Sequence, residues 1–218
     1  MKSSLPRVVV LGSGTGTNFE ALAEKAGDDY EIVAVGSDRR DAPILERARR
    51  RRIPTFSCTV TDFPESARHD SQLASALGAR RPEWVALAGY MRILGPDTLA
   101  ACAGRILNVH PALLPLFPGT DTHRRALAAG ASEHGATVHF VTARLDAGPA
   151  ILQGRTAVRE RDDPESLRLR VQALEHRIYP LALAWCARGR VLLRQNRAWF
   201  DGRPLDEPVT ILEARQCA

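Results

Sequence analysis

Short apolar runs alternate with segments of helical spacing along the first half of this chain, and this alternation limits the possible folds more than any other feature. Apolar runs rich in β-branched residues cover 7–12, 30–36, 53–58 and 84–89. Helical spacing covers 18–26, 43–52 and 66–77. Such runs are typical of strands buried on both faces, and their short connections to helices favour a parallel sheet with helices on both sides.

The second half continues the pattern less regularly. Strands are predicted at 105–109, 136–141 and 150–158, and a long helix at 164–186, which Pro180 is expected to bend or break. A terminal hairpin is predicted from 190–195 and 198–200, turning near Asn196, and 204–218 are expected to be a loose tail. We therefore predict one α/β domain over residues 1–218, with a core at about 7–201 and a mostly parallel, Rossmann-like sheet.

Composition narrows the function classes. The 218 residues are 44% hydrophobic and 25% charged, as in ordinary soluble proteins. No run approaches the roughly 18 apolar residues of a membrane span. The N-terminus has no apolar segment followed by a small-residue cleavage site, as a secretory signal peptide would. We expect a cytoplasmic protein without a membrane partner.

The charge distribution bears on the partners. The net charge of +5 comes from scattered basic residues, and the densest run, at 47–52, has no interleaved aromatics. This favours a solvated helix face over a nucleic-acid surface, so no nucleic-acid partner is expected. A modest positive charge suits small anionic substrates.

Cysteine and histidine spacing predicts no metal site. Cys58, Cys102, Cys186 and Cys217 form no CxxC pair, so we predict reduced thiols. His134 and His139 could join His110 and Asp146, but their spacing matches no metal motif that we recognise.

A glycine-rich loop, GSGTGTN at 12–18, joins the first predicted strand to the first predicted helix. Glycines allow close backbone approach, and a helix N-terminus offers free N–H groups to an anion. The dinucleotide fingerprint GxGxxG is not met, because Thr17 occupies its third glycine position. The loop is predicted to bind phosphate, although a tight structural turn would give the same pattern.

Three further segments follow predicted strands. AGYMRIL at 88–94 could line the pocket of a flat ligand or be core with one surface charge. Asn108 and His110 are two apart on an extended strand, so both side chains point the same way, beside a Pro-flanked turn. Asp146 lies on a turn in LDAGP, where it could act in a site or bond its own backbone.

Together these segments resemble the folate-dependent formyltransferases, and within them the members that act on glycinamide ribonucleotide. The resemblance extends from about residue 7 to about 201. It is carried by SGTGTN (13–18), LAGYMRIL (87–94), LNVHPALLP (107–115), EHGATVHFVTARLDAGPAILQ (133–153) and VQALEHRIYP (171–180).

The resemblance implies roles for individual residues. The family's catalytic Asn, His and Asp match Asn108, His110 and Asp146. Its phosphate and ribonucleotide contacts match Gly16, Thr17, Asn18, Gln172 and Glu175. Its folate contacts match Met91, Arg92, Ile93, Leu94, Asn108, Thr142, Ala143, Arg144, Leu145 and Asp146.

The resemblance also implies a reaction. The co-substrate is 10-formyltetrahydrofolate, no metal takes part, and the amine attacks the formyl carbon directly. Asn108 and protonated His110 stabilise the resulting oxyanion, and Asp146 favours the imidazolium. The remaining partners are small molecules, and the chain is expected to be a monomer or a homodimer.

One position departs from the family pattern. Members often carry an Arg four residues before the Asp that matches Asp70, where it helps to hold the folate. Ser66 stands there in this chain, and the nearest arginine is Arg68.

Four other functions compete with this one. A methionyl-tRNA formyltransferase would need a further tRNA-binding domain, and a formyltetrahydrofolate hydrolase usually has an N-terminal regulatory domain. Sugar-amine formyltransferases would lack the phosphate loop as written here. A nucleotide-binding module could share the fold but would not need Asn108, His110 and Asp146 together.

Overall fold

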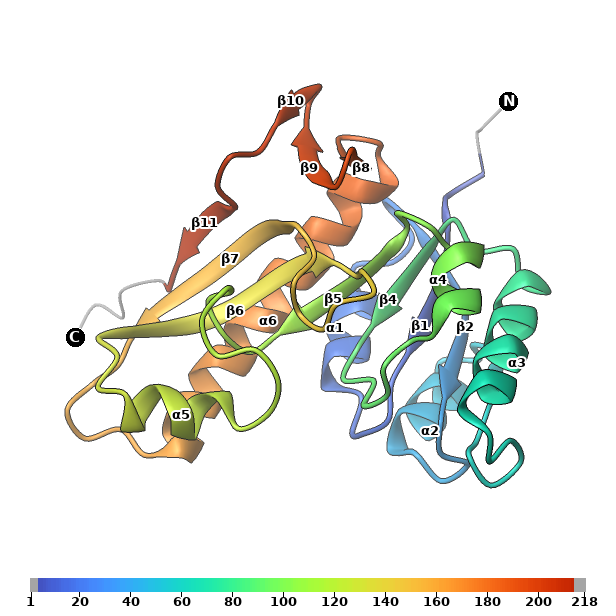
Figure 1. The fold of residues 1–218 in the computed structure, drawn as a ribbon, viewed down its shortest axis with the longest axis horizontal. Helices are drawn as coiled ribbons and strands as arrows, with labels where there is room; N and C mark the ends of the chain where they lie inside the picture. The colour runs from blue at the N-terminus through green and yellow to red at the C-terminus, as the bar shows by residue number, and fades with distance from the viewer. Residues whose placement is uncertain (1–3, 214–218) are drawn as a thin grey trace.

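The computed structural model describes residues 4–213, and its centre is an eight-stranded sheet (Figure 1). The strands of the sheet are β1 (Arg7–Leu11), β2 (Glu31–Ser37), β3 (Thr55–Ser57), β4 (Trp84–Leu87), β5 (Ile106–His110), β6 (Glu133–Phe140), β7 (Ala150–Ala157) and β11 (Val209–Leu212). Their spatial order is β11-β7-β6-β5-β4-β1-β2-β3. Every neighbouring pair is parallel except β5–β6 and β6–β7. The predicted α/β fold with a mostly parallel sheet is confirmed.

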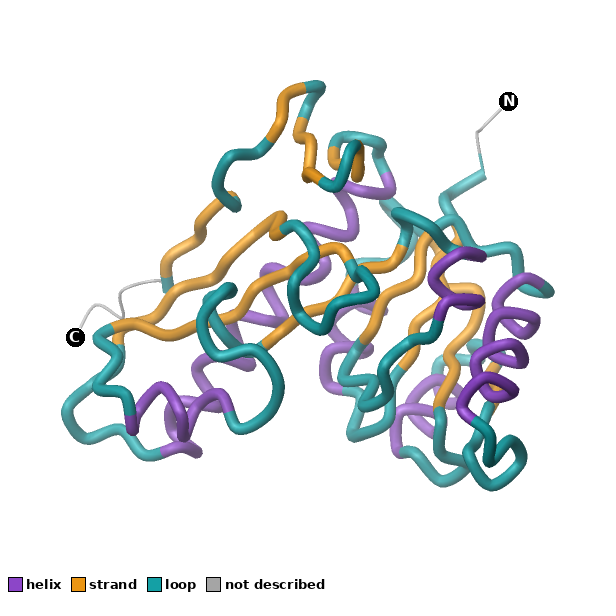
Figure 2. Tube along the Cα trace, in the orientation of Figure 1, coloured by secondary structure: helices purple, strands orange, loops and turns teal. Residues whose placement is uncertain are grey.

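Helices lie on both sides of this sheet (Figure 2). They are α1 (Thr17–Glu24), α2 (Pro43–Arg50), α3 (Ser66–Gly78), α4 (Pro96–Ala101), α5 (Thr122–Ala128) and α6 (Pro164–Ala187). The alternation of β1 divides the core, since Val8 and Val10 pack with side chains of α1, α2 and α6. Val9 and Leu11 pack on the opposite face with side chains of α3. Because both faces are covered, β1 carries apolar side chains at successive positions.

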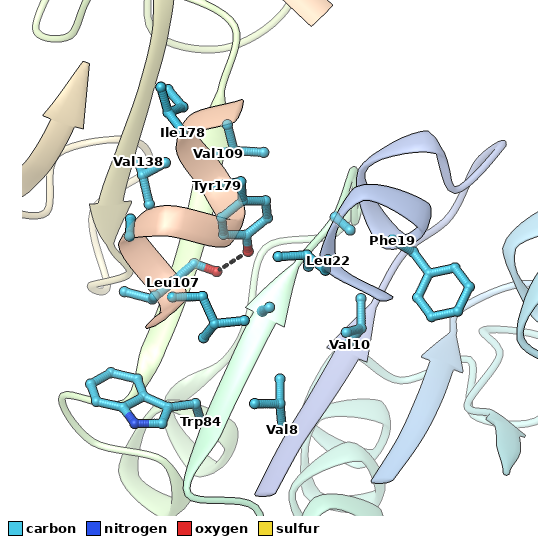
Figure 3. Close-up of a cluster of buried hydrophobic side chains, with 14 of the residues drawn as sticks. Val8, Val10, Phe19, Leu22, Trp84, Leu107, Val109, Val138, Ile178 and Tyr179 are labelled. Carbon is cyan, nitrogen blue, oxygen red and sulfur yellow. Dashed lines mark hydrogen bonds between the residues drawn. The ribbon is translucent and has the colours of Figure 1, made fainter. Parts of the chain in front are cut away.

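The long helix α6 runs across one face of the sheet and contacts β5, β6 and β7. Tyr179 is fully buried there, and its hydroxyl lies 3.1 Å from the carbonyl oxygen of Leu107 (Figure 3). The same hydroxyl lies 3.0 Å from the carbonyl oxygen of Leu87. Of the two expected effects of Pro180, a bend or a break, the break is wrong, because α6 continues through Pro180 to Ala187. A proline inside a helix costs one backbone bond, and the burial of Ile178, Tyr179 and Leu183 offsets that cost.

The C-terminal region contains a second, smaller sheet. It consists of β8 (Val191–Arg194), β9 (Arg197–Phe200) and β10 (Arg203–Pro204). The predicted hairpin is confirmed, and Gln195 and Asn196 turn it with φ of 49° and 56°, the backbone that two-residue hairpin loops favour. No helix within residues 4–213 is long and apolar enough to span a bilayer.

The expected loose tail is wrong for one segment, because Val209–Leu212 form β11 and pair in parallel with β7. Val209 and Ile211 pack against the core, and this period-two contact explains why the segment is a strand. Residues 214–218, the remainder of the expected tail, lie outside the described residues.

Candidate active site

A cleft of about 680 Å³ lies at the carboxyl ends of β4 and β5. Ligands of open α/β sheets bind at this edge. The predicted site residues that line the cleft are Asn18, Met91, Arg92, Ile93, Leu94, Asn108, His110, Thr142, Ala143, Arg144, Leu145, Asp146 and Glu175. Gly16, Thr17 and Gln172 are not among its lining residues. Thr17 belongs to α1 with Asn18, Gln172 belongs to α6 with Glu175, and Gly16 directly precedes α1.

The three predicted catalytic residues meet in this cleft. Asn108 and His110 belong to β5, and Asp146 follows β6 in the loop to β7. The Nδ1 atom of His110 lies 3.4 Å from Oδ2 of Asp146, and both side chains are buried. The Nε2 atom of His110 lies 2.9 Å from the carbonyl oxygen of Phe117. Both ring nitrogens therefore face oxygen acceptors, an arrangement that suits an imidazolium with two N–H donors.

A loop before α5 holds Asp146 from the other side, and the sequence analysis did not identify it. The N–H of Gly119 donates to Oδ2 of Asp146 at 2.9 Å. Phe117, Asp121 and Asp146 all have positive φ, at 52°, 56° and 49°. Non-glycine residues in this region are strained, and such strain gathers at functional sites. The Pro118-Gly119 turn signal was the available indication of this loop.

His139 is a further residue of the cleft that sequence reasoning considered only as a metal ligand. It lies opposite Asn108 in the β5–β6 pairing, with its Nε2 3.3 Å from Nδ2 of Asn108. Its Nδ1 donates to the carbonyl oxygen of Phe140 at 2.9 Å, which leaves Nε2 as an acceptor. Burial lowers the pKa of His139, so the neutral ring is favoured. The Asn108 amide can thus donate one N–H to His139 and keep the second for a ligand.

The glycine-rich loop is fixed against its neighbours. The N–H of Gly12 donates to the carbonyl of Gly36, and the N–H of Ile44 donates to that of Gly14. Gly16 precedes α1 with φ of 79°, and a Cβ there would lie 2.8 Å from Cγ1 of Ile44. Glycine is therefore required at position 16, and the first-turn N–H groups of α1 lie next to the cleft. Such groups lack intrahelical partners and favour an anion.

Residues predicted to contact the ribonucleotide come together where α1 meets α6. The Nε2 atom of Gln172 donates to Oγ1 of Thr17 at 3.1 Å. The Nδ2 atom of Asn18 donates to Oε2 of Glu175 at 2.8 Å. The two sequence segments that carry the ribonucleotide resemblance are thus joined side chain to side chain.

Glu175 is an unusual carboxyl for a binding site, since only 8% of its surface is exposed. Burial raises its pKa to about 7, while the hydrogen bond from Asn18 and the charge of Arg168 act in the opposite direction. The Oδ1 atom of Asn18 is buried with no partner among the described residues. Asn18 and Glu175 therefore present hydrogen-bonding capacity that a bound polar ligand could use.

The predicted folate segment protrudes at the mouth of the cleft. Met91 and Ile93 are each 74% exposed, whereas Leu94 is buried in the core. Leu145 is exposed on the facing loop. Exposed apolar side chains beside a cleft are typical of a binding surface for a flat ligand.

Ser66, which stands where family members often carry an arginine, lies outside the cleft. Ser66 is the first residue of α3, and both Ser66 and Arg68 are exposed. Neither lines the cleft, whereas Arg92 does, and its Nε is buried with no partner among residues 4–213. Arg92 and Arg144 are therefore arginines that a ligand in the cleft can reach, whereas Ser66 and Arg68 do not line it.

The cysteines lie apart from this chemistry. Cys58, Cys102 and Cys186 are free and buried. Cys217 lies outside the described residues.

Known proteins resemble this chain over most of its length. The Formyl transferase family model matches residues 6–183. Phosphoribosylglycinamide formyltransferase of Escherichia coli (strain K12) is 43% identical over 201 residues, which cover 91% of this chain and 95% of that protein.

Solved structures of related enzymes also superpose on this chain. Phosphoribosylglycinamide formyltransferase from Coxiella burnetii, in complex with CHES, superposes with a TM-score of 0.91 at 44% identity, over 95% of this chain and 100% of that one. A formyltetrahydrofolate deformylase from Pseudomonas syringae superposes with a TM-score of 0.83 at 27% identity, over 91% of this chain and 66% of that one.

The fold and the cleft thus define a group-transfer enzyme built on a mixed α/β sheet. The chain belongs to the formyl transferase family. The relatives that match it over nearly their whole length are phosphoribosylglycinamide formyltransferases.

Proposed function

We propose that this protein transfers the formyl group of 10-formyltetrahydrofolate to the amine of 5′-phosphoribosylglycinamide. The products are formylglycinamide ribonucleotide and tetrahydrofolate, a step of de novo purine biosynthesis. The observation that carries the proposal is the convergence of Asn108, His110 and Asp146 in one cleft between the two expected substrate sites. The names of the relatives support the choice of substrates.

The two substrates would enter from opposite sides of the catalytic residues. The phosphate would bind at the N-terminus of α1, near Gly16 and Thr17, with the rest of the ribonucleotide toward Asn18 and Glu175. The folate would lie between residues 91–94 and the loop 142–146. This arrangement brings the amine of one substrate to the formyl group of the other at Asn108 and His110, so that positioning alone lowers much of the barrier.

Attack of the amine nitrogen on the formyl carbon forms a C–N bond and a tetrahedral intermediate with an oxyanion. Fixed donors aimed at that oxygen stabilise the transition state. The second N–H of the Asn108 amide is such a donor, because its first N–H is oriented by His139. His110 is the second donor, and its hydrogen bond to the Phe117 carbonyl would yield to the more strongly accepting oxyanion.

The intermediate collapses when the bond from the formyl carbon to the folate nitrogen breaks. The amine must lose a proton, and the departing nitrogen must gain one. Asp146 orients His110 through its Nδ1 atom and, with a water molecule, can relay the proton between the two nitrogens. The formyl-folate supplies the one-carbon unit, and no covalent intermediate on the protein is required.

Replacement of His110 or Asp146 tests the proposal. His110→Ala and Asp146→Ala should each reduce turnover by about three powers of ten, because each removes part of the oxyanion and proton-transfer machinery. Formyl transfer would be followed by the absorbance of the released folate, with circular dichroism and thermal unfolding to confirm that each variant folds. Turnover close to that of the wild type in either folded variant would contradict the assignment.

A further inference from the structure

The loop from Gly89 to Gly95 connects β4 to α4 and carries the exposed side chains of Met91 and Ile93 at the mouth of the cleft. Exposed apolar side chains on a free loop would lose much conformational entropy when a ligand orders them. In this structure, side chains from two distant segments hold the loop instead. Ser13 holds its beginning, and Asp70 holds its end.

Ser13 of the glycine-rich loop makes two hydrogen bonds to the start of the 89–95 loop. Its backbone N–H donates to the carbonyl of Gly89 at 3.0 Å. Its Oγ accepts the N–H of Met91 at 2.8 Å. The start of the loop therefore depends on a residue that also belongs to the phosphate loop.

Asp70, on α3, holds the other end with its whole carboxylate. Its Oδ1 accepts the N–H of Gly95 at 3.0 Å, and its Oδ2 accepts that of Asp97 at 2.8 Å. Thr98 approaches both oxygens with its N–H at 3.4 Å and donates its hydroxyl to the backbone carbonyl of Asp70 at 3.2 Å. A Cβ on Gly95 would lie 2.4 Å from Oδ2, so the contact also requires glycine at position 95.

This carboxylate is buried, with 6% of the residue exposed, and no ion pair within residues 4–213 involves it. A buried charge is costly unless it is hydrogen-bonded. Its stabilisation here comes from the N–H groups that end the 89–95 loop and begin α4, whose dipole also favours a negative charge. The buried carboxylate of Asp70 thus needs these N–H groups, and the end of the loop keeps its conformation because they bond to Asp70.

Asp70 does not line the cleft and touches no substrate site. Resting on the proposed function, we propose that Asp70 is a positioning residue for folate. It fixes the 89–95 loop so that Met91, Arg92 and Ile93 meet the folate without further ordering. Pre-ordering of this kind lowers the entropic cost of binding and therefore appears in the affinity for one substrate.

The test is Asp70→Asn, which keeps the shape of the side chain but replaces one acceptor oxygen with an NH₂ donor. The N–H of Gly95 or that of Asp97 then faces a donor, and the end of the loop is released. The KM for 10-formyltetrahydrofolate should rise about tenfold, the effect expected when one hydrogen bond to a charged group is lost. The KM for the ribonucleotide should stay within about twofold of the wild type, because the side-chain bonds that join α1 to α6 involve neither Asp70 nor the end of the loop.

Asp163→Asn is the matched control. Asp163 also accepts a backbone N–H at a helix start, that of Ser166 at 2.7 Å, but it does not line the cleft. It should leave both KM values unchanged. Thr98→Val removes only the hydroxyl bond to Asp70 and should raise the folate KM about threefold. This variant replaces Asp70→Asn as the test if Asp70→Asn does not fold.

Two results would overturn the proposal: a folate KM within twofold of the wild type in folded Asp70→Asn, or equal rises in both KM values. If Asp70→Asn does not fold, an unchanged folate KM in Thr98→Val overturns it. Failure of the proposed function would look different, because the wild type itself would then show no turnover with the ribonucleotide.

Discussion

At the residue scale, the charge of Glu175 changes within the physiological pH range. Its pKa of about 7 follows from burial at the contact between α1 and α6, which a single hydrogen bond from Asn18 only partly offsets. In the unfolded chain the same carboxyl ionises near its ordinary value of about 4.5. Between these two values the folded protein binds a proton that the unfolded chain has lost, so the free energy of unfolding falls as pH rises.

Glu175→Gln removes this titration while keeping an oxygen that can accept from Asn18. The variant should therefore gain stability relative to the wild type between pH 5 and pH 8. The gain should reach about 3 kcal/mol above pH 7 and be small at pH 5. Urea unfolding at several pH values measures the difference directly. A stability difference that is constant from pH 5 to pH 8 would show that the Glu175 carboxyl ionises normally in the folded protein.

At the scale of elements, the loop between β1 and α1 links sequence to site most directly. Gly16 allows the chain to turn into α1 with positive φ while Ile44 of α2 packs against it. The glycines alone predict a turn that places free N–H groups at the start of α1, and the phosphate site at this turn stays a prediction. The side-chain contacts of Thr17 with Gln172 and of Asn18 with Glu175 could not be predicted, because they depend on how α6 crosses the sheet.

Gly16→Ala should lower the free energy of unfolding by about 2 to 4 kcal/mol, because a Cβ there is strained and meets Ile44. Gly14→Ala is its control, since a Cβ on Gly14 meets nothing within 4 Å. That variant should unfold close to the wild type. Thermal or urea unfolding of the pair measures the effect, and equal stability of the two variants would mean that the space and the backbone at position 16 are not limiting.

The pairing of β5 with β6 brings together residues that the sequence alone did not predict to be neighbours. Alternation along a strand predicts that Asn108 and His110 share one face, and the structure has both in the cleft. The contact between Asn108 and His139 arises from the antiparallel register of β5 with β6, which no local pattern reveals. Helices α4 and α5 were also missed, because they are short, and the seven residues of α5 are mostly polar or small.

At the scale of the whole molecule, the order of the strands in the sheet brings the candidate site residues together. The apolar runs predicted the existence of the parallel strands, whereas their order and the antiparallel insertion of β6 depend on contacts between distant segments. The same is true of β11, which pairs with β7 across more than fifty residues of sequence. Because β6 lies next to β5, the loop that carries Asp146 returns to His110, and the expected folate and ribonucleotide sites meet at that point.

The most direct test of the central claim is an absorbance assay with 10-formyltetrahydrofolate, run with and without 5′-phosphoribosylglycinamide. We expect tetrahydrofolate to be released only when the ribonucleotide is present, with one formylated ribonucleotide formed for each folate consumed. Release of formate without any amine acceptor would identify a hydrolase instead, and absence of turnover under both conditions would contradict the account.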